Sequence, residues 1–234
     1  MMKKTLSISL FLCLYALGGV FAQQFIEPVE NPMSKECYLT PKNGVETKCE
    51  FKSATISNGI KSMTIVDENG VKIKYKAEEV EKLRMKMSTL AKIGTIMDGS
   101  ESLADVADLD INEIIEREFV IWEQALLPKK KDKYALLQLL NPGFDARIKV
   151  YENPMGQESG GLTVGGVKVT GGEDKSFLVV KDGDKSMKIK KGSYKKDFSM
   201  LFGDCPQMLK TFSDEKIKFQ DMAIHVLYYE WNCK

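Results

Sequence analysis

The chain of 234 residues contains a single histidine, His225, and no pair of cysteines at zinc-binding spacing. A catalytic triad or a histidine-ligated metal needs a placed imidazole together with its partners. No serine or cysteine nucleophile motif lies near His225, which sits between Ile224 and Val226. We therefore expect His225 to be an ordinary residue on the surface of the last helix or partly packed beneath it.

Complete metal and nucleotide motifs are also missing. Segment 108–112 carries oxygen ligands at alternate positions, like a calcium loop. Glu113 then stands where glycine must allow the turn, and Phe119 where a bidentate glutamate is needed. Glycine pairs between residues 160 and 172 are followed by no Lys-Ser/Thr pair, so hairpin turns explain them better than a phosphate cradle. The sequence predicts no metal and no cofactor.

An excess of either charge is absent, since 34 basic residues face 33 acidic ones. Nothing in this balance favours nucleic acid as a partner. Only one long apolar run is present, at residues 6–17. Lys3 and Lys4 precede it, and small residues follow it, with Val20 and Ala22 at the −3 and −1 positions of a cleavage site. This pattern predicts a secretory signal peptide over residues 1–22, too short for a membrane span. The mature chain should be exported, whether periplasmic, surface-associated or secreted, and should have no transmembrane segment.

Cysteines are few beyond the signal, namely Cys37, Cys49, Cys205 and Cys233. An even number in an exported chain predicts two disulfides, for which three pairings exist. A three-residue loop at 42–44, with Gly44 in the left-handed conformation, would place Cys37 opposite Cys49 in a hairpin. By elimination, Cys205 then pairs with Cys233.

The first half of the mature chain predicts strands. Residues 23–35 carry prolines and should form a flexible, loosely ordered tail. Within residues 36–97, strands at 37–40, 47–56, 60–66 and 71–75 are separated by three Asn-Gly pairs, which predicts an antiparallel meander. Val80, Leu83, Met87 and Leu90 have helical spacing, so we expect one covering helix that ends near Gly94.

The remaining chain changes from acidic to β-rich and then to helical. Residues 98–117 form an acidic linker or helix, and 118–234 form β hairpins followed by C-terminal helices. Strands are expected at 118–126, 134–140, 148–151, 162–164, 167–170, 176–181 and 186–190, with 134–140 and 148–151 forming one pair. Helices are expected at about 194–202, 206–212 and 219–229. The fold class is therefore α+β, an antiparallel β meander and hairpins with one covering helix and a helical C-terminal end.

Four stretches resemble exported β-rich proteins of the Bacteroidota that have no assigned activity. They are Glu36–Thr40 with its Asn43-Gly44 turn, Asp67–Lys72 leading to Tyr75–Val80, Phe177–Lys181, and Tyr194–Phe198 with Leu201–Pro206. Glu79 departs from the pattern, which usually has aspartate there. The resemblance implies export and a β-rich fold with a helical C-terminal end, and it implies no site residue.

The densest basic patch comprises Lys188, Lys190, Lys191, Lys195 and Lys196. It is a candidate contact for an anionic surface such as lipopolysaccharide or polysaccharide, although solubility alone explains exposed lysines. Two functions follow as hypotheses. The first is a non-catalytic binding or interaction module for an envelope glycan or protein. The alternative is a small, glycosidase-like hydrolase that uses two carboxylates, whose spacing is spatial and invisible in the sequence.

Overall fold

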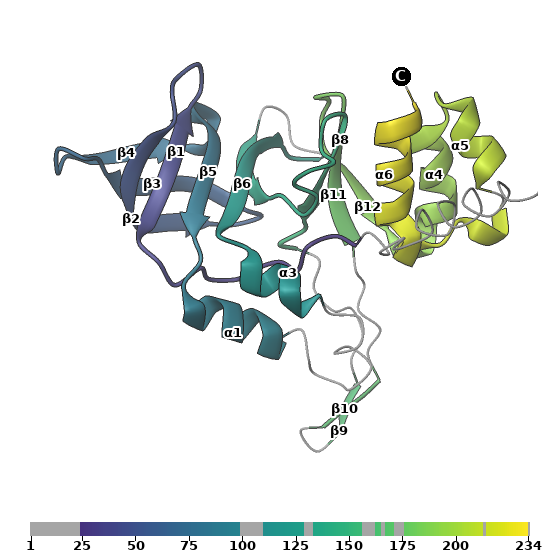
Figure 1. The fold of residues 1–234 in the computed structure, drawn as a ribbon, viewed down its shortest axis with the longest axis horizontal. Helices are drawn as coiled ribbons and strands as arrows, with labels where there is room; N and C mark the ends of the chain where they lie inside the picture. The colour runs from purple at the N-terminus through teal and green to yellow at the C-terminus, as the bar shows by residue number, and fades with distance from the viewer. Residues whose placement is uncertain are drawn as a thin grey trace, which may run out of the picture.

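The protein has an α+β fold of three parts, shown in Figure 1: a closed β-sheet, a three-stranded sheet beside it, and a layer of helices at the C-terminal end. The computed structural model describes residues 24–98, 110–128, 133–155, 162–164, 167–170, 176–212 and 214–233. The predicted signal peptide and the start of the calcium-like segment, Asp108, lie outside these ranges.

The first sheet has seven antiparallel strands in the order β2-β1-β5-β6-β7-β3-β4. They are β1 (Glu36–Pro41), β2 (Thr47–Ile56), β3 (Ile60–Val66), β4 (Lys72–Lys76), β5 (Val80–Lys86), β6 (Phe119–Leu126) and β7 (Tyr134–Gln138). The four strands predicted for the meander are confirmed. An additional pairing of β2 with β3 closes the sheet on itself. Alternate side chains point inward and fill the interior, where Leu39, Leu83 and Val120 are almost completely buried.

The predicted helix over residues 80–90 is wrong. Residues 80–86 form β5, a strand inserted between β1 and β6. Leu83, Met85 and Met87 are buried at every second position, whereas Leu90 is 69% exposed. Leu83 and Met87 fit both a period of 2 and a helical period, so pairing with two neighbouring strands decides the conformation. The covering helix is α1 (Thr89–Asp98), and Gly94 lies within it instead of ending it.

The hairpin turns differ from expectation in one detail. Asn43, with φ 61°, takes the left-handed conformation that we predicted for Gly44. Asparagine tolerates this conformation better than most residues, and the Gly44 amide still donates to the Pro41 carbonyl across the turn (2.9 Å). The predicted register is unaffected, and Cys37 stands opposite Cys49.

The segment expected to be a loose tail makes contacts with the rest of the fold. The Ile26 amide donates to the Leu140 carbonyl (2.9 Å), and the Val29 amide donates to Oε1 of Gln138 (3.2 Å). Val29 is 3% exposed, and the Phe25 ring lies 5.1 Å from that of Phe177. In Figure 1 this segment passes from the three-stranded sheet towards β1. Its prolines suggested looseness, but its apolar side chains pack on the sheets.

The second sheet has the order β12-β11-β8, with β8 (Ile148–Glu152), β11 (Ser176–Lys181) and β12 (Met187–Lys190). The hairpin predicted over residues 176–190 is confirmed. The expected pairing of 134–140 with 148–151 is largely wrong, because β7 and β8 belong to different sheets joined by one bridge between Leu139 and Tyr151. The predicted short strands β9 (Leu162–Val164) and β10 (Val167–Thr170) pair with each other.

The remaining helices are α3 (Ile111–Glu116), α4 (Tyr194–Phe202), α5 (Pro206–Thr211) and α6 (Met222–Asn232). Asp110 caps α3 by accepting a hydrogen bond from the Glu113 amide (3.0 Å), which gives the acidic residue a structural role. Helices α4–α6 pack on the second sheet through a core rich in aromatic residues, with Phe198, Phe202 and Tyr229 fully buried. In the part of the chain that the structure describes, no helix has the length and apolar character needed to cross a membrane.

Candidate functional site

The predicted basic patch extends from β12 into the first turn of α4. We call Lys188, Lys190, Lys191, Lys195 and Lys196 the lysine surface. Ile189 points into the helical core and is fully buried, so the alternation of a strand directs Lys188 and Lys190 away from that core. The other three lysines follow directly, around the buried Tyr194. The local fold therefore exposes all five.

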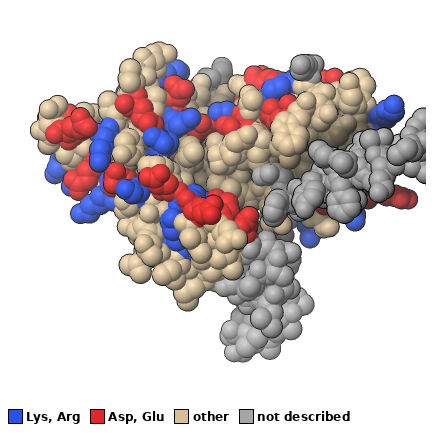
Figure 2. Space-filling model, viewed as in Figure 1, with Lys and Arg blue, Asp and Glu red and all other residues tan. Residues whose placement is uncertain are grey.

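No side-chain ammonium group of this surface forms an ion pair or hydrogen bond with a residue that the structure describes. The seven-stranded sheet differs, because Lys48 and Lys86 both contact Glu36 and Arg84 contacts Glu46. Figure 2 shows basic and acidic side chains lying side by side at that end of the molecule. Residues 185–196 contain six lysines and no acidic residue, and Asp184 and Asp197 flank this stretch. Among the described residues, neither of these carboxylates forms an ion pair with the lysine surface.

Part of this arrangement has a structural explanation. β12 is an edge strand, and lysines on edge strands discourage pairing with other chains. β4, the last strand in the order of the seven-stranded sheet, has the same pattern, with exposed Lys72 and Lys74 on either side of Ile73. What distinguishes β12 is the addition of Lys191 and the two lysines of α4.

A second feature is a cavity of about 300 Å³ where α5 begins and α6 ends. We call it the α6 hollow. Its lining residues are Arg147, Asp204, Cys205, Pro206, Gln207, Asn232 and Cys233. Both disulfides expected from the sequence are present, and the Cys205–Cys233 bond, with Cα atoms 5.6 Å apart, forms part of this lining. The other bond joins Cys37 to Cys49 across β1 and β2.

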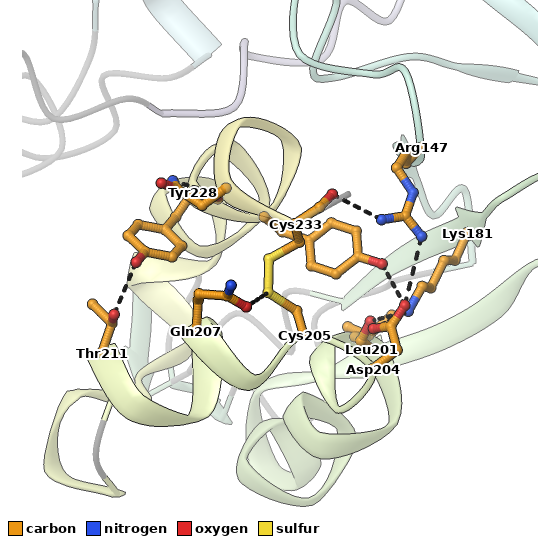
Figure 3. The surroundings of a disulfide bond; sticks show 11 residues. Arg147, Lys181, Leu201, Asp204, Cys205, Gln207, Thr211, Tyr228 and Cys233 are labelled. Atoms are coloured by element: carbon orange, nitrogen blue, oxygen red, sulfur yellow. Dashed lines mark hydrogen bonds and ion pairs between the residues drawn. A yellow bond between two sulfur atoms is a disulfide. The ribbon is translucent and has the colours of Figure 1, made fainter.

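Charged groups beside the hollow form a network, and Figure 3 shows the part of it around Asp204. Arg147 binds Asp182 through two hydrogen bonds of 2.9 Å and donates to the Cys233 carbonyl at 3.0 Å. Lys181 donates to Asp204 (2.7 Å), which also accepts a hydrogen bond from the Tyr229 hydroxyl (2.6 Å). The two cations and two carboxylates balance in charge. The network thus holds β11, the start of β8 and the C-terminal helices together.

The carboxylates of this network are poor candidates for a general acid. Burial opposes ionisation of Asp204, but the hydrogen bonds from Lys181 and Tyr229 outweigh it and lower its pKa. The hydrogen bonds from Arg147 likewise lower the pKa of Asp182. Glycosidases need one carboxylic acid that stays protonated, usually through a raised pKa. Glu152, at the end of β8, does have a raised pKa because it is partly buried and faces the charge of Glu30.

His225 is fully buried, not at the helix surface. Its Nδ1 lies 2.8 Å from the Tyr194 hydroxyl, and the rings of Phe198 and Phe212 approach it at 5.1 and 4.5 Å. Burial lowers its pKa to about 4, although the charge of Asp221 and the Lys216 backbone favour the protonated form. Its Nε2 makes no hydrogen bond with the described residues. His225 is therefore a neutral core residue.

A buried charge between the sheets was not apparent from the sequence. Glu123 on β6 is 5% exposed and contacts the ammonium groups of Lys82 (3.1 Å) and Lys149 (2.5 Å). The Tyr151 hydroxyl donates to the same carboxylate at 3.3 Å. Since every polar group here has a partner, the cluster acts as a structural link between β5, β6 and β8. Among the described residues, no group of three or more histidine, cysteine, aspartate or glutamate side chains is placed to hold a metal ion.

Comparison of the chain with family models, curated proteins and solved structures gives no significant match.

Proposed function

We propose that the protein is an exported, non-catalytic binding module that holds an anionic polymer of the cell envelope on its lysine surface. The observation that carries this proposal is the set of five exposed, unpaired lysines between positions 188 and 196. The ligand would present clustered phosphate or carboxylate groups, as lipopolysaccharide or an acidic polysaccharide does.

The two disulfides support the proposed location outside the cytoplasm. Disulfides persist in oxidising compartments outside the cytoplasm and are rare inside it, and the structure has two. The sequence pattern of a signal peptide and the resemblance to exported Bacteroidota proteins point the same way. The signal-peptide pattern rests on residues 1–22, which the other two lines of support do not use.

The unpaired state of the lysines favours binding of a polymer. A lysine already paired with a carboxylate must lose that partner before it can contact a ligand anion, whereas an unpaired lysine loses only water and mobility. A single exposed contact is weak, about 1 kcal/mol or less. Five such contacts made at once by one polymer would add up, because the ligand groups are already linked.

The hydrolase alternative receives less support from the geometry. At the α6 hollow, Asp182 and Asp204 both have lowered pKa values, so neither would hold the proton that a leaving group needs. We therefore assign the binding module as the function that the described residues support best.

The proposal is tested by binding of the mature chain to lipopolysaccharide vesicles and, separately, to polygalacturonate. We expect the variant K188Q/K190Q/K191Q to bind at least about tenfold more weakly than the unchanged protein, on the scale of about 1 kcal/mol per lysine. The matched control is K72Q/K74Q, which removes lysines from the same Lys-Ile-Lys pattern on the other edge strand. It should bind as the unchanged protein does.

Salt provides a second measurement. Raising the salt from about 0.01 M to about 1 M shortens the Debye length from about 30 Å to about 3 Å and should remove most of the binding. A preference for vesicles identifies a lipid phosphate, and a preference for the acidic polysaccharide identifies a carboxylate polymer. The lysine surface is refuted as the binding site if K188Q/K190Q/K191Q and K72Q/K74Q weaken binding equally, or if neither probe binds at low salt.

A further inference from the structure

The segment before β1 lies against residues that come much later in the chain. We call residues 25–32 the strap; Figure 1 shows it passing from the three-stranded sheet towards β1. Nη1 of Arg117 donates to the Glu27 carbonyl at 2.7 Å, and the Ser88 amide donates to the Pro32 carbonyl at 3.0 Å. We call the residues that hydrogen-bond or stack with the strap the strap site: Ser88, Arg117, Gln138, Leu140, Phe144 and Phe177.

A short hinge joins the strap to β1. Oδ1 of Asn31 accepts a hydrogen bond from the Met33 amide at 2.9 Å, which closes a local turn. Two residues later, the Lys35 carbonyl accepts from the Phe51 amide at 2.7 Å, so the chain is fixed to the first sheet from there on. The strap can therefore change its direction relative to β1 only through the backbone at Met33 and the residue after it.

The hinge holds an unfavourable backbone conformation. Met33 has φ 50°, in the left-handed region. The other non-glycine residues with positive φ in the described part of the chain are Asn43, Asn58 and Asp182, which belong to the types that tolerate this region best. Met33 is also 55% exposed, so packing of its side chain compensates little. Closing the hinge thus stores strain that an extended hinge would release.

The strap site also has an unused hydrogen-bond donor. Gln138 is 2% exposed, and its Oε1 accepts from the Val29 amide at 3.2 Å. Its Nε2 has no hydrogen-bond partner among the described residues. A side-chain amide can both accept from and donate to a neighbouring backbone, so the strap satisfies only half of this one. The closed hinge therefore holds the strap short of its best fit.

We propose that two copies of the chain exchange their straps, so that the strap of each copy occupies the strap site of the other. The second copy is the partner that the site fits, because it supplies the same sequence to the same contacts. In the exchanged dimer the hinge is extended, and a strap carbonyl can reach Nε2 of Gln138. Exchange of an identical element is a low-cost route to a dimer, and a short strained hinge favours it. The inference does not depend on the lysine surface, which belongs to β12 and α4.

The hinge should control the amount of dimer. The contacts of the strap are the same in the closed monomer and in the exchanged dimer, so they largely cancel, and the hinge conformation decides between the two at a given concentration. M33V should favour the dimer, because a β-branched residue strongly disfavours positive φ. M33G should favour the monomer, because glycine adopts positive φ readily.

Sedimentation of the mature protein over a range of concentrations measures this effect, after each variant has been unfolded in urea with its disulfides intact and refolded. We expect the dimer dissociation constant to be at least about tenfold lower for M33V than for M33G, since each dimer contains two hinges. The matched control is N43G, which changes a residue of positive φ in the turn between β1 and β2. It should leave the dimer fraction unchanged.

Cross-linking then identifies the contact between the copies. The rings of Phe25 and Phe177 lie 5.1 Å apart, so we expect a short bismaleimide to join chains carrying F25C to chains carrying F177C when the two are refolded together. The control mixes F177C with V45C, whose thiol lies in the β1–β2 turn at a position that is 81% exposed. This pair should give only background cross-linking.

Three results would overturn the proposal. The first is that the unchanged protein, M33V and M33G all stay monomeric at the highest concentration reached. The second is that M33V and M33G form the same fraction of dimer. The third is that dimers form but F25C and F177C cross-link no more than V45C and F177C do.

Discussion

Acid should destabilise the helical layer through the imidazole of His225. In the folded protein its pKa is about 4, compared with 6.5 for an unperturbed histidine. The unfolded chain therefore binds a proton at higher pH than the folded chain does. The stability that neutral His225 contributes is fully present above about pH 6.5 and is lost as the pH falls towards about 4. The reason is that acidification favours the unfolded state, which takes up the proton more readily.

The size of the effect follows from these two values. A difference of about 2.5 pKa units corresponds to about 3 kcal/mol over the whole range, and about 2 kcal/mol of this is lost by about pH 5. Total stabilities of about 5–15 kcal/mol make such a loss readily measurable. The surroundings explain the direction: the Tyr194 hydroxyl hydrogen-bonds to Nδ1, aromatic rings surround the imidazole, and Asp221 only partly offsets the burial.

Urea denaturation at several pH values between about 7.5 and 5 measures this slope, which cannot exceed about 1.4 kcal/mol per pH unit for one group. The variant H225N keeps an acceptor near the position of Nδ1 but does not titrate. We expect it to be less stable at neutral pH, because it leaves a cavity, and to have a flatter dependence on pH. Equal slopes for H225N and the unchanged protein would refute the assignment of acid sensitivity to His225.

Other perturbations have equally specific outcomes. C233S should lower the free energy of unfolding more than C49S does. The loop-entropy model gives about 3.6 against about 2.8 kcal/mol, because the bonds span 28 and 12 positions. Calorimetry of the single variants measures both losses, and a larger loss for C49S would contradict the model. G59A should lower stability clearly more than G70A does. Both positions have positive φ, but a Cβ at Gly59 would lie 2.7 Å from a side chain, whereas one at Gly70 meets nothing within 4 Å. Equal melting temperatures of the two variants would contradict this. E152Q should stabilise the protein at neutral pH, because the raised pKa of Glu152 means that its ionisation opposes folding as the pH rises above 4.5. If E152Q and the unchanged protein differ in free energy of unfolding by the same amount at acid and at neutral pH, this prediction is wrong.

Local signals in the sequence predicted local structure well. The Asn43-Gly44 turn and the cysteine spacing gave the correct register of Cys37 and Cys49. Pro206 correctly marked the start of α5. Such features depend on residues close together in the chain, where turn chemistry and capping act. Helix or strand could not be decided for residues 80–86, because their conformation depends on pairing with β1 and with β6, which lies more than thirty positions later.

The two candidate sites also differ in how far the sequence predicts them. The lysine surface was visible in the sequence, because its five members lie within one short segment. That they are unpaired could be learned only from the positions of all carboxylates around them. The α6 hollow brings Arg147 together with Gln207, 60 positions later, and with Asn232, 85 positions later, and no motif connects them. The burial of His225 depended on Phe198 and Phe212 closing around it.

The packing of residues 25–32 has a consequence for the order in which the chain can fold. The Val29 amide depends on Gln138, 109 positions later, and the Glu27 carbonyl depends on Arg117, 90 positions later. Because synthesis proceeds from the N-terminus, this segment would be made well before the residues that it contacts. Contacts over such separations slow folding, because a long loop must close before they form. Residues 25–32 would thus be among the last to reach their native place, joining two sheets that have already formed.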